Sequence, residues 1–345
     1  RAGRGGTAAA QPAVAPAPSK PQRPRRRLHL RRVPIVRTVL LLIVVSVIAL
    51  VAGGAYFDTK LHRVDALVDY AGRPADTPGT NWLIVGSDSR QGMTAAQQKE
   101  YSTGGDLGNG RTDTIMLVHI PRSGKPLLIS IPRDLYVPIP GQGDYKINAA
   151  YYFGGPQLLE KTFETKSGVH IDHYAEIGFG GFADMVDAVG GIRMCLDAPL
   201  NDPEAGIRLK AGCQTMNGRT ALGYVRSRHF PAADLERVVH QREFLAALMH
   251  KVTSPSTLID PFALWGVTKG AVDGLTVDNG THIWDIIRLA WALKSSPITV
   301  TTPTDGNEDT DDGEALVWGA STDRFFALIR AGRPVPSDLL TSGPG

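Results

Sequence analysis

The sequence predicts an α/β domain whose central sheet is covered by helices on both faces, preceded by one membrane-spanning helix. A run of 20 residues without a charge, 38–57, lies ahead of most of the chain. After it, short apolar stretches that end in turn residues alternate with stretches of helical period, which is the pattern of strands interleaved with helices. A chain of 345 residues is long enough for one large or two medium domains.

The uncharged run has the length of a transmembrane helix. At about 1.5 Å per residue it covers roughly 30 Å, the thickness of the hydrocarbon core of a bilayer. Residues 1–37 contain ten basic and no acidic residues, whereas the rest of the chain contains 27 basic and 34 acidic residues. Because basic flanks stay on the cytoplasmic side, we expect a single-pass protein of the cell membrane with a cytoplasmic N-terminus and an extracellular domain.

The alternative interpretation of this segment is a cleaved signal peptide. The charged lead alone has 37 residues, against about 15–30 for an entire signal peptide, which favours an anchor. The Ala-, Pro- and Arg-rich residues 1–37 predict a disordered basic cytoplasmic tail, and residues 58–80 predict a juxtamembrane connector. The arginine run fits a topology signal and a contact with anionic membrane lipid better than a nucleic-acid arm, so no nucleic-acid partner is expected.

Strands and helices are predicted in alternation along the rest of the chain. Apolar runs bounded by turn residues predict strands, and apolar residues at helical spacing predict helices. We expect strands at 81–88, 112–120, 126–131, 192–196 and 298–302, and helices at 156–165, 180–189, 217–225, 234–252, 261–272, 282–293 and 323–331. The polar residues 304–314 predict a loop, the glycine-rich run 178–182 predicts a close-packed strand-to-helix turn, and the tryptophans are expected mainly in the core.

The two cysteines, Cys195 and Cys213, lie 18 positions apart in the predicted extracellular part, where disulfides persist. We predict a disulfide between them, which would stabilise the fold by roughly 3 kcal/mol; two separately buried thiols are the alternative. The sequence has no CxxC, HExxH, GxSxG or Walker motif. Redox, zinc-protease, serine-hydrolase and nucleoside-triphosphatase chemistry therefore lack their usual motifs.

Arginine and aspartate residues gather where the predicted strands and helices begin or end. Because ligands of open α/β sheets bind at strand ends and the guanidinium group matches phosphate oxygens, this pattern predicts a site for a pyrophosphate-like anion. Carboxylates beside that anion need a hard cation between them, and Mg²⁺ fits; simple salt bridges at the strand ends are the alternative. The residues are Asp88, Arg90, Arg111, Asp113, Arg133, Asp134, Arg226, Arg228, Asp234, Arg237 and Gln241.

Seven motifs in order resemble the LytR–CpsA–Psr family of cell-wall assembly enzymes, in its actinobacterial type. They are GSDSR, GRTDT, SIPRD, KINAAYYFGG, GFGGFADMVDAVGGI, MNGRTALGYVRSRH and DLERVVHQR, between about residues 81 and 251. The resemblance implies a three-layer α/β/α sandwich around a central mixed sheet, with an apolar pocket for a lipid. It implies a catalytic domain at 81–253 and a C-terminal extension at 254–345, packed on that domain or appended to it. One departure is a polar, Gly-rich insertion at 91–110, which we expect to gate the site.

The resemblance also implies a reaction. A glycopolymer, such as teichoic acid, arabinogalactan or capsule, would pass with its linking phosphate from a polyprenyl-pyrophosphate carrier to a sugar hydroxyl of peptidoglycan. Two alternatives stay open: a polyprenyl-pyrophosphate phosphatase that uses water as acceptor, and a non-enzymatic envelope regulator that binds lipid or glycan.

Site roles follow from the matched motifs. Asp88 and Asp113 are expected to hold Mg²⁺, and either is a candidate general base. They would act in catalysis with Arg111 and Arg133. Substrate binding is expected from Arg90, Lys146, Arg226, Arg228, Asp234, Arg237 and Gln241.

Overall fold

The computed structural model describes residues 32–88, 94–101, 112–227, 233–254, 257, 259–295, 297–311 and 313–340. Within these ranges the side chains of residues 32–34, of Asp113 and of residues 233–242 are not described. The chain divides into two compact units, Arg1–Leu50 and Val51–Gly345. The description that follows concerns each unit by itself.

The first described element is the apolar helix α1, Arg32–Asp58. Its stretch Ile35–Asp58 has 24 residues and is long and apolar enough to cross a membrane. Its leucine, isoleucine and valine side chains are exposed on all sides, which is unfavourable in water and expected in lipid. The helix covers the whole of the predicted segment 38–57.

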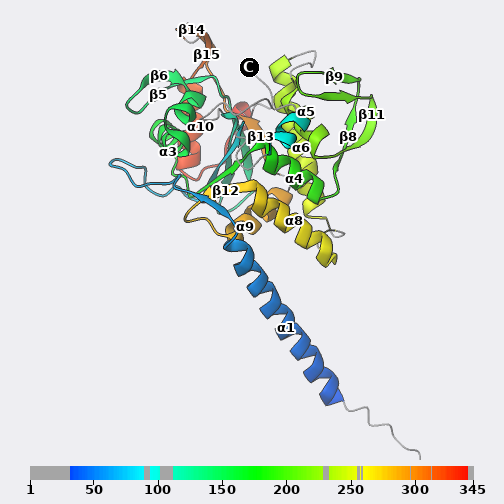
Figure 1. The fold of residues 1–345 in the computed structure, drawn as a ribbon. Helices are drawn as coiled ribbons and strands as arrows, with labels where there is room; N and C mark the ends of the chain where they lie inside the picture. The colour runs from blue at the N-terminus through cyan, green and yellow to red at the C-terminus, as the bar shows by residue number, and fades with distance from the viewer. Residues whose placement is uncertain are drawn as a thin grey trace, which may run out of the picture. The chain divides into compact units, whose positions relative to one another are not determined.

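The second unit is built around a seven-stranded mixed sheet (Figure 1). β2 is parallel to β7 and antiparallel to β3, and the two edge strands β1 and β13 are each parallel to their neighbour. In spatial order the strands are β1 (His62–Val64), β12 (Leu275–Asp278), β7 (His173–Ile177), β2 (Thr80–Ser87), β3 (Thr112–Ile120), β4 (Leu127–Ile131) and β13 (Ile298–Thr301).

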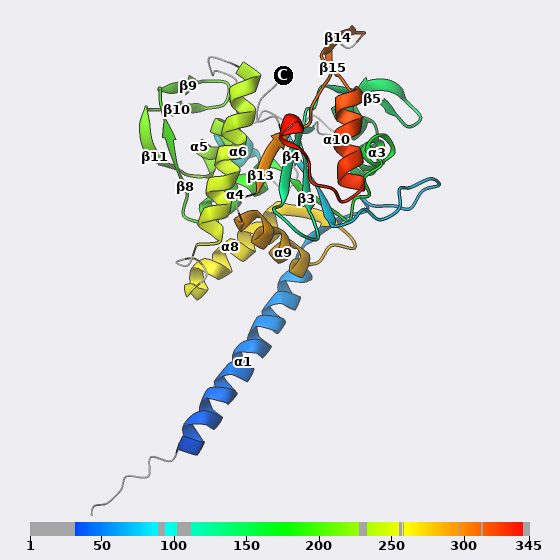
Figure 2. The same ribbon diagram turned by 180° about the vertical axis from the view of Figure 1, so that it is seen from behind.

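Helices cover both faces of this sheet, which confirms the three-layer α/β/α prediction (Figure 2). Because side chains alternate along a strand, Trp82 of β2 packs into one core and Leu83 into the other. One layer holds α3 (Ile147–Ser167) and α10 (Ala320–Arg330). The other holds α4 (Phe179–Ala188), α5 (Gly218–Arg226), α6 (Ala233–Val252), α8 (Pro261–Gly274) and α9 (Ile283–Lys294).

Smaller sheets flank the central one. β5 (Leu135–Ile139) and β6 (Gly143–Lys146) join β14 (Asn307–Thr310) and β15 (Gly313–Val317) in a four-stranded sheet, and β9 (Leu200–Asp202) pairs with β10 (Ile207–Leu209). β8 (Ile192–Leu196) pairs with β11 (Gly212–Met216), and a disulfide joins Cys195 to Cys213 directly across this pair. Two short elements complete the described fold, α2 (Ala95–Glu100) and the 3₁₀ turn Ser337–Leu339.

Two predictions about the C-terminal third are wrong. Residues 304–314 were expected to form a loop, but they contribute β14 and the start of β15. Their side chains are polar and largely exposed, so the sequence lacks the alternation of apolar residues that marks a strand. The tryptophans Trp265, Trp284 and Trp291 are 52%, 46% and 66% exposed. They lie outside the core, because their helices present these side chains outward.

Segments outside the expected 81–253 core take part in the central sheet. β12 and β13 come from residues after 254, and β1 comes from the connector 58–80. The C-terminal region is therefore part of the same sheet and of the same compact unit.

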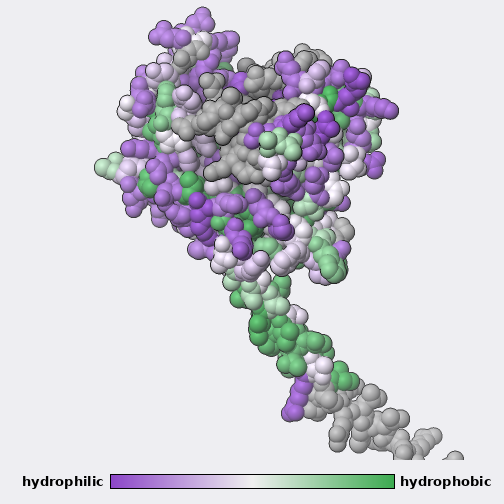
Figure 3. All heavy atoms as spheres, in the orientation of Figure 1, coloured by the Kyte–Doolittle hydropathy of each residue, from purple (hydrophilic) through white to green (hydrophobic). Residues whose placement is uncertain are grey.

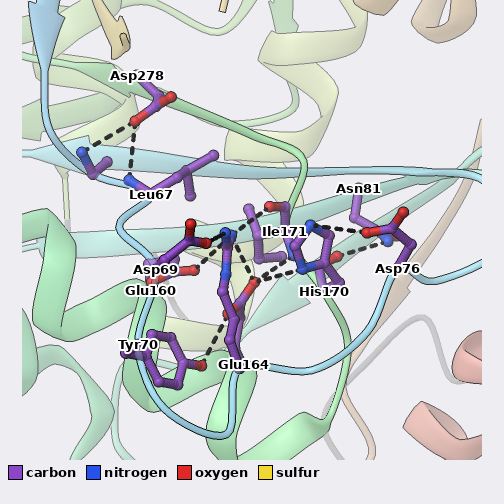
Figure 4. Close-up of polar contacts among 12 residues, drawn as sticks. Leu67, Asp69, Tyr70, Asp76, Asn81, Glu160, Glu164, His170, Ile171 and Asp278 are labelled. Atoms are coloured by element: carbon purple, nitrogen blue, oxygen red, sulfur yellow. Dashed lines mark hydrogen bonds and ion pairs between the residues drawn. The ribbon is translucent and has the colours of Figure 1, made fainter. Parts of the chain in front are cut away.

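The connector is held to the body by a buried charge cluster (Figure 4). Arg73 donates to Glu160 at 3.3 Å and to Glu164 at 3.0 Å, and it also donates to the Ile171 carbonyl at 3.1 Å. The Tyr70 hydroxyl donates to Glu164 at 2.9 Å. Both carboxylates lie fully inside the protein, so this one arginine compensates two buried acidic groups.

The glycine-rich run 178–182 is a close-packed strand-to-helix turn, as predicted. β7 ends at Ile177 and α4 begins at Phe179. Within α4, a Cβ on Gly181 would overlap the backbone of Gly274 in α8. The two helices therefore approach each other as closely as their backbones allow, which positions the α4 side chains over the sheet.

Candidate active site

The ends of three strands meet at one edge of the central sheet. β2 and β7 run parallel and finish together, with Gly86 opposite Ile177. β4 runs antiparallel to β3, so β4 also finishes at this edge, where β3 begins. Asp88 follows β2 by one residue and Arg133 follows β4 by two. The fold therefore brings these two predicted residues to the same edge, where α/β sheets bind ligands.

A β-bulge places Asp113 at this edge as well. The register shifts between Gly86 and Ser87, which pair with Thr114 and Thr112. The Thr112 hydroxyl donates to the Gly86 carbonyl at 3.1 Å. The backbone of Asp113 thus lies between these pairs, across from the strand that ends at Asp88.

An apolar cavity of about 390 Å³ opens between this edge and the helical layer of α4, α5 and α6. Its apolar walls hold Ile84, Met116, Ile177, Phe179, Phe182, Met185, Ala205, Leu222, Val225, Phe244, Leu245 and Leu248. The polar part of the lining includes three carboxylates, those of Asp88, Asp202 and Glu204, together with Arg226. Such a lining suits a ligand with a long apolar part and a charged group.

Arg226 reaches the cavity from the last residue of α5. The helix begins after Asn217, whose side chain accepts from Thr220 N at 3.0 Å. The Arg226 Nη1 atom donates to the Tyr101 carbonyl at 3.1 Å, and its guanidinium lies 4.7 Å from the centre of the Phe179 ring. These contacts orient the guanidinium at the cavity wall, since a cation is attracted to an aromatic face.

Arg133 and Lys146 form a second cationic group. Asp134 lies between them, with its Oδ2 3.3 Å from Arg133 Nε and its Oδ1 3.6 Å from Lys146 Nζ. The Arg133 carbonyl accepts from Asn148 N at 3.3 Å, which ties this loop to the start of α3. Among the described residues, Arg133 and Lys146 share the carboxylate of Asp134.

A half-buried carboxylate that the sequence did not point to lies near the end of β2. Glu176, on β7 beside Val85, accepts from the Tyr151 hydroxyl at 2.7 Å and from the Tyr174 hydroxyl at 2.9 Å. Burial, and then the negative charge of Glu176, raise the pKa of both phenols well above the usual value. Tyr151 and Tyr174 therefore stay protonated and hold Glu176 in place.

The aromatic cavity walls were also missed. Phe179 and Phe182 line the cavity but lie in the run predicted only as a turn. Tyr101, which packs in a cluster with these two rings, belongs to the insertion 91–110. Within that insertion the described residues form α2, capped by Thr94, and Tyr101 is buried against Leu222. The spacing of Phe179 and Phe182, one helical turn apart, was the available signal.

Several predicted site residues cannot be compared with the structure. Arg90, Arg111 and Arg228 lie outside the described residues. Asp113, Asp234, Arg237 and Gln241 have a described backbone only, the last three in α6. Of the predicted set, the structure brings Asp88 and Arg226 to one cavity and joins Arg133 to Lys146 through Asp134.

The donor set at this edge fits Mg²⁺ rather than a metal held by protein alone. Across the described ranges no three His, Cys, Asp or Glu side chains come together as a metal site. Mg²⁺ needs only one or two carboxylates when phosphate oxygens and water complete its coordination. Asp88 supplies one carboxylate at the cavity, and of Asp113 only the backbone is described.

The structure thus combines a mixed α/β/α sandwich with an apolar cavity and with charged residues at the ends of its central strands. The model of the LytR_cpsA_psr family matches residues 58–324. The chain belongs to this family, which confirms the resemblance read from the motifs. The match extends beyond the motif region at both ends, in agreement with the strands that those segments supply.

Individual relatives agree. The chain is 50% identical over 274 residues to the probable cell wall biosynthesis protein LcpB of Corynebacterium glutamicum, covering 79% of this chain and 66% of LcpB. It is 31% identical over 262 residues to the regulatory protein MsrR of Staphylococcus aureus, covering 72% of this chain and 75% of MsrR. The chain thus spans just under two thirds of the length of LcpB.

Solved structures share the fold. A LytR-Csp2A-Psr enzyme from Actinomyces oris has a TM-score of 0.60 at 22% identity, covering 78% of this chain and 96% of the other. TagT bound to LI-WTA has a TM-score of 0.55 at 23% identity, covering 79% and 97%. At these identities the likenesses show that the chain shares the fold of these structures.

Proposed function

We propose that this protein is a membrane-anchored phosphotransferase of cell-wall assembly. It takes a glycopolymer with its linking phosphate from a polyprenyl-pyrophosphate carrier and joins it to a peptidoglycan sugar hydroxyl. The observation that carries the proposal is the cavity, which combines long apolar walls with Asp88 and Arg226 in its lining. A polyprenyl chain matches the walls, and its pyrophosphate matches the guanidinium groups. The related TagT fold, seen bound to LI-WTA, supports a carrier-linked donor of this kind.

The reaction requires stabilisation of negative charge more than covalent chemistry by the protein. The acceptor hydroxyl oxygen forms a bond to the phosphorus that carries the glycan, the bond from that phosphorus to the bridging oxygen breaks, and polyprenyl phosphate leaves. Arg133 and Arg226 bind phosphate oxygens as charge spreads in the transition state. The hydroxyl proton passes to a carboxylate, and Asp88 or Asp113 is the proposed base.

Asp88 and Asp113 would also hold the Mg²⁺ ion. When bound there, this cation neutralises charge on the pyrophosphate oxygens. The carboxylate that does not take the proton would remain a ligand of the cation. The cation would reduce the repulsion between the aspartates and the pyrophosphate.

The proposed location follows from α1 and the charge asymmetry. A single apolar helix in the membrane, with the basic tail in the cytoplasm, places the catalytic unit outside the cell. There it meets both the carrier lipid and the growing wall.

The deciding experiment supplies the full chain, in detergent, with a short-chain polyprenyl-pyrophosphate glycan and peptidoglycan fragments, with and without Mg²⁺. Products are identified by mass spectrometry. We expect a glycan joined to peptidoglycan through one phosphate, formed only with the metal. Donor cleavage that ignores the acceptor would instead indicate a phosphatase, and binding without turnover would indicate a regulator.

Two matched arginine variants test whether Arg133 binds the phosphate oxygens. Arg133→Ala should lower transfer by about 100-fold or more, in the range for loss of one preorganised donor to a developing anion. Arg122→Ala is the control, because Arg122 is exposed in the turn between β3 and β4, at the opposite edge of the sheet. Equal activity of the two variants would refute the role of Arg133.

A further inference from the structure

Two helices present apolar side chains outward, where a surface in water is normally polar. On α9, Trp284, Ile287 and Trp291 follow the i, i+3, i+7 spacing of a single stripe and are about half exposed or more. On α8, Phe262 and Trp265 lie one turn apart and are 87% and 52% exposed. We name these five residues the apolar face. Exposed patches of this kind mark an interaction site.

The apolar face is continuous with the end of α1. The Trp265 ring stacks on Tyr56 at 6.1 Å between ring centres and packs against Phe57 at 4.7 Å. A Cβ on Gly54 would lie 2.5 Å from the Trp284 ring, so that ring covers the helix at a residue without a side chain. In Figure 3 the surface of α1 is mostly hydrophobic along the residues that are not drawn in grey.

Polar contacts hold this junction together. Asp58, the last residue of α1, accepts from the backbone N of Ile283 at the start of α9 at 2.8 Å. It also forms an ion pair with Arg63 at 3.2 Å, and its Oδ2 lies 3.1 Å from His282 Nδ1. All of these residues belong to the unit Val51–Gly345. The end of α1 is therefore fixed to the helix that carries most of the apolar face.

Cationic side chains accompany the exposed rings. Lys294 Nζ lies 4.9 Å from the centre of the Trp291 ring, and Lys60 Nζ lies 5.7 Å from that of Tyr56. Arg288, on the turn between Ile287 and Trp291, has a side chain that is 82% exposed. Tryptophan and tyrosine rings beside lysine and arginine are the combination found at the level of lipid headgroups.

We propose that the apolar face rests in the headgroup region of the leaflet from which α1 emerges. The proposal rests on the membrane anchoring proposed above. Lipid is the occupant because the face continues the surface of a helix that already requires lipid, and because its rings and cations match that boundary. The exposed rings of α8 and α9 then lie at the lipid boundary.

The test uses the full chain reconstituted in nanodiscs of phosphatidylcholine and phosphatidylglycerol, with part of the phosphatidylcholine brominated near the headgroup. Bromine quenches tryptophan emission at short range. Three of the five tryptophans belong to the apolar face, so quenching of roughly half of the emission is expected for rings at the interface. Unquenched emission would overturn the proposal.

Single substitutions locate the quenched rings. Trp291→Phe should lower the quenched fraction, because it removes a ring at the interface. Trp82→Phe is the matched control and should raise that fraction, because Trp82 is 1% exposed in the core and contributes only unquenched emission. An unchanged fraction in Trp291→Phe, with native circular dichroism, would overturn the proposal.

A separate measurement distinguishes failure of this inference from failure of the anchor. Flotation of the full chain with vesicles after an alkaline wash reports the anchor alone. A chain that floats but whose Trp291 is not quenched refutes the apolar face and leaves the anchor intact. A chain that does not float refutes both. Phosphotransfer is not measured in either experiment, so loss of the proposed activity would leave these results standing.

Discussion

The substitution Glu160→Gln should stabilise the protein in mildly alkaline solution. Glu160 is fully buried, and its Oε2 atom has no hydrogen-bond partner among the described residues. Burial, and then the neighbouring Glu164, raise the pKa of Glu160 to about 9, although Arg73 opposes the shift. The folded protein thus holds a proton on Glu160 at neutral pH, whereas the unfolded chain releases it above the ordinary pKa of 4.5.

The direction of the pH effect follows from this difference. A raised carboxyl pKa means that the folded state binds more protons between the two pKa values. The contribution of Glu160 to stability is therefore fully present below about pH 4.5 and is lost as the pH rises toward 9. One proton corresponds to about 1.4 kcal/mol per pH unit. The free energy of unfolding of the wild type should therefore fall by on the order of 3 kcal/mol between pH 6 and pH 8. Glutamine does not titrate and avoids this loss.

Thermal unfolding of the full chain in detergent, followed by circular dichroism at pH 6 and pH 8, measures the effect. For a unit of this size, 1 kcal/mol corresponds to about 2 °C in Tm. The Tm difference between Glu160→Gln and the wild type should therefore be roughly 6 °C more favourable to the variant at pH 8 than at pH 6. Glu164→Gln is the control, because Glu164 accepts from Tyr70, Arg73 and Ile171 N and its neutralisation should destabilise at both pH values. A Tm difference independent of pH would refute the reasoning.

Three further predictions concern packing, the cross-link and the cavity. Gly181→Ala forces a Cβ into the α8 backbone and should lower the free energy of unfolding by about 1–3 kcal/mol. Gly266→Ala should not destabilise the protein, because the new Cβ would lie 3.6 Å from its nearest neighbour. Thermal unfolding measures the Tm of both variants. Replacing Cys195 and Cys213 by serine should cost roughly 3 kcal/mol, matched by adding reductant to the wild type and measured by urea unfolding. Arg226→Ala should weaken donor binding by about tenfold or more, as expected for one charge-assisted contact, in a titration with the polyprenyl-pyrophosphate glycan.

Much of the site could be predicted because its chemistry sits at the ends of strongly patterned elements. The apolar runs 81–88 and 112–120 match β2 and β3 closely, and the polar residues that follow or precede such runs meet at a sheet edge. Asp88 and Arg133 were therefore predictable as neighbours of one edge. The walls of the cavity were not, because Phe182 and Phe244 become neighbours only when α4 and α6 pack on the same face, with ring centres 5.4 Å apart.

By itself, the sequence determined the elements whose signal is local. These elements are the apolar run 38–57, the central strands and the Arg- and Asp-rich motifs. Each depends on residues that are close together in the chain, so composition and spacing reveal it. The tertiary structure alone decided the pairings between distant segments. β1 joins β12 across more than 200 residues, and β14 and β15 form a polar hairpin that no burial pattern marks.

Exposure was likewise decided only by packing. From its hydrophobicity, a tryptophan in a helix is expected in the core. Trp284 and Trp291 are nevertheless exposed. The buried side of α9, which covers the sheet, carries Ile283, Leu289 and Leu293. Which stripe of a helix is buried depends on where its neighbours lie, and those neighbours come from the whole chain.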